Sequence, residues 1–188
     1  DTWRNGKISY RQVDEMCEVL AEYARIMKGY QVENCRAYAT SALREAQNSK
    51  IVVDQIRVRA GIDVRVISNS EQRFISYKAI AYKDAEFQKV IQKGTAILDV
   101  GNGSTQISLF DKDSLVSTQN LPLGAVRLMD IMRHMKTTAE KERKLIQELV
   151  DNELVTFRKI YLKDRKIENL IGVGKVTLVL YQRIMEEV

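Results

Sequence analysis

The sequence predicts an α/β protein of two parts, each with helices packed on a β-sheet. In the first part, helical patterns alternate with short strand-like segments, as in an α/β layered fold. In the second part, three strand-like segments follow one another before the helices begin. A polar stretch over residues 83–94, closed by Gly94, separates the two patterns. We therefore expect domains over residues 1–84 and 85–188.

The first part opens with a predicted amphipathic helix over residues 9–28. Ser9 and Gln12 have the spacing of a capping box, and Gly29 suits the end of a helix. Cys17 lies on the apolar stripe of this helix and is expected in the core. Further along, we expect a strand at 36–40, a helix from 49 to 61, a half-buried strand at 62–66 and a helix at 70–83.

The second part opens with residues 95–100, a nearly continuous apolar run typical of a central strand. A tight turn follows at 101–104, and then two strands at 105–109 and 115–121. The remaining expected elements are a helix at 124–135, a long helix capped by Thr137 and Glu140 that ends near residue 160, a strand at 170–173 and a last helix from Gly174.

Composition excludes several classes of function. The chain has 188 residues and a net charge of +5, with its basic residues scattered, so we expect no nucleic-acid partner. The sequence contains no apolar run of membrane-spanning length. The absence of a CxxC pair favours reduced thiols and a cytoplasmic location. With His134 as the single histidine, expected at the surface, a His/Cys metal site or a His-based triad is not predicted.

The strongest chemical signal is the turn that follows the central strand. Asp99 ends the strand, and Gly101, Asn102, Gly103 and Ser104 form the turn. Glycine lets backbone N–H groups approach an anion closely, and a carboxylate can orient a divalent cation or its water ligands. The pattern predicts a phosphate cradle. An ordinary β-hairpin is the alternative, because Asn and Gly are also the favoured hairpin residues.

Four segments together resemble the exopolyphosphatase/guanosine pentaphosphatase (Ppx/GppA) family. In family order, they are ATSALREAQN at 39–48, ISNSEQ at 67–72, LDVGNGSTQ at 98–106 and LPLGAVRL at 121–128, with a weaker glycine turn at 171–174. The resemblance implies the actin-like ATPase (ribonuclease H-like) superfold, with parts of two lobes. The opening strand–turn–strand of the family has no counterpart here, so we expect it before residue 1.

The resemblance also implies an activity and a site. Members of the family remove terminal phosphate from polyphosphate or guanosine pentaphosphate, usually with Mg²⁺, and are often homodimers. Arg44 would bind phosphate through its planar guanidinium, and Asp99 would lie near the metal and the attacked phosphorus. The other implied phosphate-binding residues are those of the turn: Gly101, Asn102, Gly103 and Ser104.

The sequence departs from the family where its two catalytic glutamates are expected, because Gln72 and Gln106 occupy those positions. An amide cannot take a proton near neutral pH, and losing a general base typically costs about 10²–10⁴ in rate. Gln can still orient a water molecule. Glu71 is not expected to substitute, since adjacent helix residues point about 100° apart. Ser70 and Asn102 also differ from the family pattern, which favours natural divergence over engineered substitution.

Three functional hypotheses follow. The first is a metal-dependent phosphoanhydride hydrolase, supported by Arg44, Asp99 and the glycine turn. The second is a non-catalytic polyphosphate- or alarmone-binding regulator, supported by Gln72 and Gln106. The third is a sugar-kinase-like or actin-like ATPase, against which the segments 39–46 and 121–128 argue.

Overall fold

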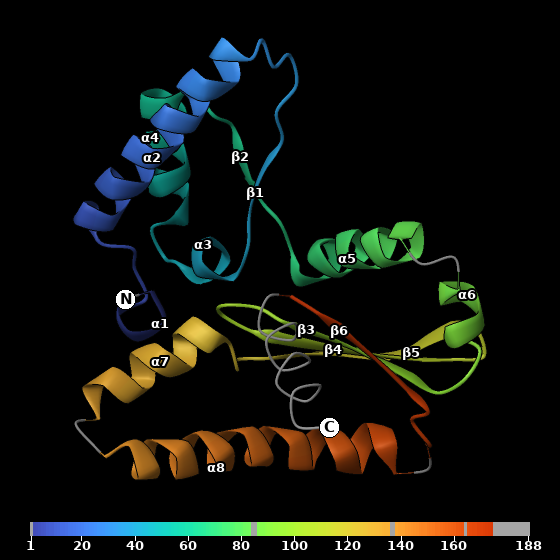
Figure 1. The fold of residues 1–188 in the computed structure, drawn as a ribbon. Helices are drawn as coiled ribbons and strands as arrows, with labels where there is room; N and C mark the ends of the chain where they lie inside the picture. Colours follow the sequence, from blue (N-terminus) through green and yellow to red (C-terminus); the bar gives the residue numbers. More distant parts are fainter. Residues whose placement is uncertain (1, 84–85, 136–137, 164, 175–188) are drawn as a thin grey trace. The chain divides into compact units, whose positions relative to one another are not determined.

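The computed structural model describes residues 2–83, 86–135, 138–163 and 165–174, and the chain divides into two compact units, Asp1–Phe74 and Ile75–Val188 (Figure 1). The division falls within helix α5 (Asn69–Lys83), earlier in the chain than the expected boundary between residues 84 and 85. The assignment of residues 1–84 and 85–188 to two actin-like lobes stays a prediction.

Unit 1 packs two long helices against a small parallel sheet. Helices α2 and α4 lie side by side (Figure 1), and their buried residues Val13, Cys17, Val52 and Ile56 form the centre of the core. Strands β1 and β2 pair in parallel, with Ala37 opposite Val64. The elements of unit 1 are α1 (Thr2–Asn5), α2 (Tyr10–Gly29), β1 (Ala37–Ala39), α3 (Ser41–Glu45), α4 (Ser49–Ala60), β2 (Val64–Val66) and the start of α5.

Local signals at the helix ends of unit 1 are confirmed. The Ser9 hydroxyl accepts the Gln12 N–H at 3.3 Å, and the Gln12 side chain accepts the Ser9 N–H at 3.2 Å, so the predicted capping box is present. Gly61 ends α4 in the left-handed region at φ +66°, where its N–H donates to the Arg57 carbonyl. Cys17 is 1% exposed, as its place on the apolar stripe predicts.

Unit 2 is built on a four-stranded sheet with the order β5-β4-β3-β6. Strands β3, β4 and β5 are antiparallel neighbours, and β6 pairs with β3 in parallel. The three consecutive strands expected from the sequence are thereby confirmed. The elements are α6 (Phe87–Val90), β3 (Thr95–Val100), β4 (Thr105–Asp111), β5 (Ser114–Leu121), α7 (Ala125–His134), α8 (Ala139–Phe157), the π-helical turn η1 (Arg158–Leu162) and β6 (Asn169–Val173).

Each face of this sheet has its own apolar cluster. On one face, Ile107, Leu109 and Leu121 pack with Phe157 at the end of α8, which runs along the sheet in Figure 1. On the other face, Ile97 and Phe110 pack with α6 and with Tyr77 and Ile80 of α5, and we call this the α5 face. The Tyr77 and Phe110 rings meet edge-on with centroids 5.3 Å apart. The α5 face also carries the polar side chains described below.

Two expectations for the second part need correction or fall outside the described residues. The N-cap of α8 is Thr138, without a side-chain capping bond, while Thr137, the expected cap, lies outside the described residues. The helix predicted from Gly174 onward also lies outside them. Among the described helices, none is long and apolar enough to cross a bilayer.

Candidate functional site

The turn between β3 and β4 is anchored through its carbonyl groups. The N–H of Ala125 donates to the Gly101 carbonyl at 3.1 Å, and the N–H groups of Val126 and Arg127 donate to the Asn102 carbonyl at 2.9 and 3.1 Å. These are N-terminal N–H groups of α7, which have no partners within their own helix. The turn therefore caps α7, and its carbonyl groups point toward that helix.

Gly124, the N-cap of α7, makes this close approach possible. A Cβ at Gly124 would lie 2.3 Å from the Asn102 oxygen and 2.3 Å from the Gly103 carbonyl carbon. In addition, the Thr105 hydroxyl donates to the Leu123 carbonyl. The segments 98–106 and 121–128, which are distant in the sequence, are thus one interlocked structure.

The same geometry leaves backbone donors on the turn. The Gly101 N–H donates to the Ser104 carbonyl at 3.0 Å. Within the described ranges, no backbone hydrogen bond uses the N–H groups of Asn102, Gly103 or Ser104, although Gly103 and Ser104 are buried. Successive unpaired N–H groups of this kind can form an anion-binding concavity.

Neither turn glycine has a positive φ. The requirement for glycine comes instead from crowding at Gly101, where a Cβ would lie 3.0 Å from the Ser104 oxygen. Because β3 and β4 are antiparallel, the turn is also a hairpin connection. The cradle and hairpin interpretations are therefore compatible with each other in one loop.

A row of polar side chains crosses the α5 face beside this turn. Asp99 on β3 is in register with Gln106 on β4, which is in register with Asn120 on β5. Directly opposite residues on antiparallel strands have Cβ atoms about 4.5–5.5 Å apart and point to the same face. Of the site residues predicted from the sequence, Asp99 and Gln106 are therefore brought together, and Asn120 lies beside Gln106.

Asp99 is half-buried, and its carboxylate accepts a hydrogen bond from the Ser76 hydroxyl of α5 at 3.2 Å. Burial raises the pKa of Asp99, and the bond from Ser76 partly offsets that rise. The end of β6 passes close by: Gly174 has φ +101°, and a Cβ there would lie 2.9 Å from the Val100 oxygen and 3.8 Å from an Asp99 carboxylate oxygen.

Both amides of the row have buried side-chain atoms without a hydrogen-bond partner among the described residues. Gln106 is 2% exposed, and neither its side-chain oxygen nor its nitrogen is bonded to any described residue. The buried side-chain oxygen of Asn120 is also without a partner in these ranges. A buried unsatisfied polar group typically costs about 1–3 kcal/mol. The sequence does not predict a role for Asn120, because only cross-strand register places it beside Gln106. Its one sequence signal is its position immediately before Leu121.

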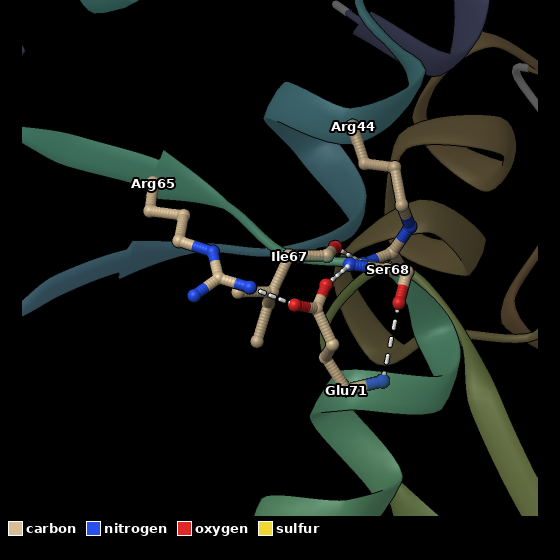
Figure 2. Close-up of polar contacts among 5 residues, drawn as sticks. All are labelled: Arg44, Arg65, Ile67, Ser68 and Glu71. Carbon is tan, nitrogen blue, oxygen red and sulfur yellow. Dashed lines mark hydrogen bonds and ion pairs between the residues drawn. The ribbon is translucent and has the colours of Figure 1, made fainter.

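Arg44 and Gln72, the other residues that the sequence predicts for the site, belong to unit 1. Arg44 on α3 is half-buried and donates to the Ile67 carbonyl at 2.8 Å, as Figure 2 shows. Desolvation lowers the pKa of Arg44, against the opposing effect of Glu45, but a guanidinium stays charged at neutral pH. It carries five N–H donors, and the bond to Ile67 uses one.

Glu71 has a structural role at the start of α5 (Figure 2). Its carboxylate accepts the Ser68 N–H at 2.8 Å, its own N–H donates to the Ser68 hydroxyl at 3.1 Å, and Arg65 forms an ion pair with it. The bonds from Ser68, followed by the charge of Arg65, lower the pKa of Glu71 and make it a weaker base. Gln72 follows, one helical turn before Ser76 on α5.

Asn48, the last residue of the segment 39–48, also has a structural role. Its side chain accepts the Ile8 N–H at 3.0 Å and donates to the Ile8 carbonyl at 2.8 Å. The N–H of the neighbouring Gln47 donates to the Gly6 carbonyl. This segment therefore both carries Arg44 and holds residues 6–8 in place within unit 1.

The sequence profile of the Ppx/GppA phosphatase family matches residues 2–187. The chain belongs to this family. Exopolyphosphatase 1 of Mycobacterium tuberculosis (strain ATCC 25618 / H37Rv) is 27% identical over 125 residues, which cover 66% of this chain and 35% of the relative. Exopolyphosphatase 1 of Mycobacterium leprae is 26% identical over 151 residues, covering 80% of this chain and 43% of the relative. The chain thus spans less than half the length of these relatives.

Solved structures of the Ppx/GppA family show the same fold. An exopolyphosphatase from Cytophaga hutchinsonii aligns with a TM-score of 0.70 and 23% identity, covering 97% of this chain and 57% of that one. A Ppx/GppA family member from Aquifex aeolicus aligns with a TM-score of 0.61 and 23% identity, covering 92% and 53%. The α/β fold expected from the sequence is confirmed, and it is the fold of these Ppx/GppA family structures.

The donor atoms beside the Ppx/GppA turn suit a hard cation. Within the described ranges, no cluster of three or more His, Cys, Asp and Glu side chains could hold a metal. The row instead offers one carboxylate, Asp99, which accepts a bond from the Ser76 hydroxyl. Gln106, in register with Asp99, adds an amide oxygen that has no partner among the described residues. Oxygen ligands with a single carboxylate fit Mg²⁺, which keeps several waters and binds substrate phosphates, and do not fit a structural zinc site.

Proposed function

We propose that the protein is an exopolyphosphatase-like phosphoanhydride hydrolase that acts on polyphosphate or guanosine pentaphosphate, with both usual catalytic glutamates replaced by glutamine. The observation that carries the proposal is the turn at 101–104. Its first two carbonyls accept hydrogen bonds from α7, while the N–H groups of residues 102–104 have no backbone partner among the described residues. A terminal phosphate supplies the acceptor oxygens that such donors require.

The positive contribution to binding would come from Arg44. Its planar guanidinium matches the geometry of phosphoryl oxygens, and its partial burial strengthens a charge-assisted hydrogen bond. The bond from Arg44 to the Ile67 carbonyl restricts the side chain before substrate arrives, so less conformational entropy would be lost on binding.

Asp99 would hold Mg²⁺, with the Ser76 hydroxyl and the Gln106 amide oxygen as neighbouring oxygen donors. When bound, Mg²⁺ would neutralise charge on the phosphoryl oxygens. Burial raises the pKa of Asp99, and a bound cation would favour its ionised form.

Gln72 and Gln106 would orient water or phosphate without accepting a proton. Loss of the general base predicts a rate about 10²–10⁴ below that of a glutamate-bearing enzyme. Glu71 does not replace the lost base, because its carboxylate is bonded to Ser68 and paired with Arg65. These observations also support the alternative proposal, a non-catalytic regulator that binds the same phosphates.

Phosphate release from long-chain polyphosphate in the presence of Mg²⁺ tests these proposals. The intact protein is compared with the Gln72→Glu/Gln106→Glu double variant, with Arg44→Ala in the double variant as the control for the site. Comparable rates in the first two proteins support the hydrolase. Activity in the double variant alone, lost with Arg44→Ala, supports the regulator. Inactivity of both, with intact folding, contradicts the proposed site.

For the cellular setting we propose a cytoplasmic protein that forms homodimers and binds neither nucleic acid nor membrane. Support comes from the scattered positive charge, from the two free cysteines, Cys17 and Cys35, and from the family. Light scattering on the intact protein tests the dimer.

A further inference from the structure

We propose that Asn120 is a second phosphate-contacting amide, which acts beside Gln106 to bind the oxygens of the substrate's terminal phosphate. This inference rests on the proposed function and adds to it a residue on β5, outside the segments that carry the family resemblance. The observation behind it is a pair of neighbouring amides at the end of a sheet that also carries the turn 101–104: both polar atoms of Gln106 and the side-chain oxygen of Asn120 are buried without a partner among the described residues.

Register brings the two amides together. Gln106 pairs with Asn120 across the β4–β5 ladder, so both side chains lie on the α5 face. Theirs is the last row on this face before the turn, since β3 ends at Val100 and β4 begins at Thr105. The next row inward is closed, because Tyr77 of α5 donates its hydroxyl to Ser108 at 2.5 Å.

Burial without partners indicates that the amides serve a ligand. Gln106 is 2% exposed with both polar atoms unbonded, and the Asn120 oxygen is buried and unbonded, among the described residues. Most buried side-chain polar groups have a partner, and those that lack one call for an explanation such as a bound ion or water. Two such groups in register provide a site for one ligand.

The N–H donors of the two amides favour a phosphate oxygen as that ligand. Asp99 is the only carboxylate of the row, and the amides add N–H donors without adding negative charge. Rotation by 180° about the last side-chain bond exchanges the oxygen and the NH₂ group, so both amides can donate to an anion. The N–H groups of residues 102–104, which have no backbone partner within the described ranges, lie at the same end of the sheet and would bind the same phosphate.

Titration calorimetry of the intact protein with tripolyphosphate and Mg²⁺ tests the inference. We expect Asn120→Ala to weaken binding about tenfold through loss of a hydrogen bond to a charged group. Asn120→Asp should bind more weakly than Asn120→Ala, because a carboxylate has no N–H and repels phosphate. Gln119→Ala, the neighbouring amide on the opposite sheet face, is the matched control and should bind like the unaltered protein.

Thermal melting without ligand separates a binding role from a structural one. Since the Asn120 oxygen has no partner among the described residues, Asn120→Ala should melt at the same temperature as the unaltered protein or higher. The inference is overturned if Asn120→Ala binds like Gln119→Ala, if its melting temperature falls, or if Asn120→Asp binds more tightly than Asn120→Ala. If the unaltered protein does not bind tripolyphosphate, the proposed function fails first and this inference with it.

Discussion

Replacing Gly124 by alanine should destabilise unit 2 and disrupt the candidate phosphate turn together. The backbone at Gly124 has φ −106°, which alanine adopts without strain, so the effect depends on space alone. The new Cβ would lie 2.3 Å from the Asn102 oxygen, where an ordinary contact needs at least 3.4 Å. The turn would have to move away from α7 by about 1 Å.

That movement would break the capping bonds of α7. The bonds from Ala125, Val126 and Arg127 to the turn measure 2.9–3.1 Å, and lengthening by about 1 Å takes them out of hydrogen-bonding range. At about 1 kcal/mol net for each of three bonds, we expect a loss of about 3 kcal/mol in the free energy of unfolding. Tripolyphosphate binding should fall as well, because the N–H groups of residues 102–104 move with the turn.

Urea denaturation followed by circular dichroism, with calorimetric titration of tripolyphosphate, measures both effects. Gly29→Ala is the matched control, because Gly29 ends α2 and a Cβ there would meet nothing within 4 Å. Alanine there should leave stability unchanged or raise it by up to about 1 kcal/mol. If the free energy of unfolding of Gly124→Ala lies within about 0.5 kcal/mol of that of the unaltered protein, the interlocked geometry of the turn and α7 is wrong.

Three further predictions use the same thermal-melting measurement. Asp99→Asn should raise the ligand-free melting temperature at neutral pH. Burial raises the pKa of Asp99, so its carboxyl group stabilises the fold fully below its unfolded pKa of about 4, and this stabilisation is lost as pH rises through the folded pKa. Asparagine, which does not ionise, avoids that loss. If the difference in melting temperature between Asp99→Asn and the unaltered protein does not widen from pH 4 to 8, the prediction is wrong. Glu71→Ala should lower the melting temperature at neutral pH, and by less as pH falls below about 4, because bonds from Ser68 lower the Glu71 pKa. A decrease in melting temperature that does not depend on pH would contradict this prediction. Asn48→Ala should cost about 1–3 kcal/mol by leaving the Ile8 backbone groups unpaired, and an unchanged melting temperature would refute that.

Local chemistry explains which elements could be predicted. The helix over residues 9–28 followed from apolar spacing and from the Ser9–Gln12 capping box, and the structure has both. The strand at 95–100 followed from its continuous apolar run, and β3 occupies that range. Such signals are contained within a few neighbouring residues, so no knowledge of distant contacts is needed.

Helix ends without a strong local signal were harder to predict. Thr137 with Glu140 has the spacing of a capping box, yet the N-cap of α8 is Thr138 and makes no side-chain bond. The division between the two units falls between residues 74 and 75, inside α5. A continuous helix carries no sequence break at such a point, so the sequence does not indicate this division and instead suggests a boundary in the polar stretch after α5.

The sequence by itself determined the α/β class, the family, the order of the strands in the chain and the replacement of two expected glutamates by Gln72 and Gln106. Tertiary structure decided what those residues meet. Only strand register places Asn120 beside Gln106. Only the approach of α7 binds the carbonyls of residues 101 and 102, while the N–H groups of residues 102–104 have no backbone partner in the part of the chain that the structure describes. These features depend on contacts between residues some 14 to 25 positions apart, which spacing along the chain does not encode.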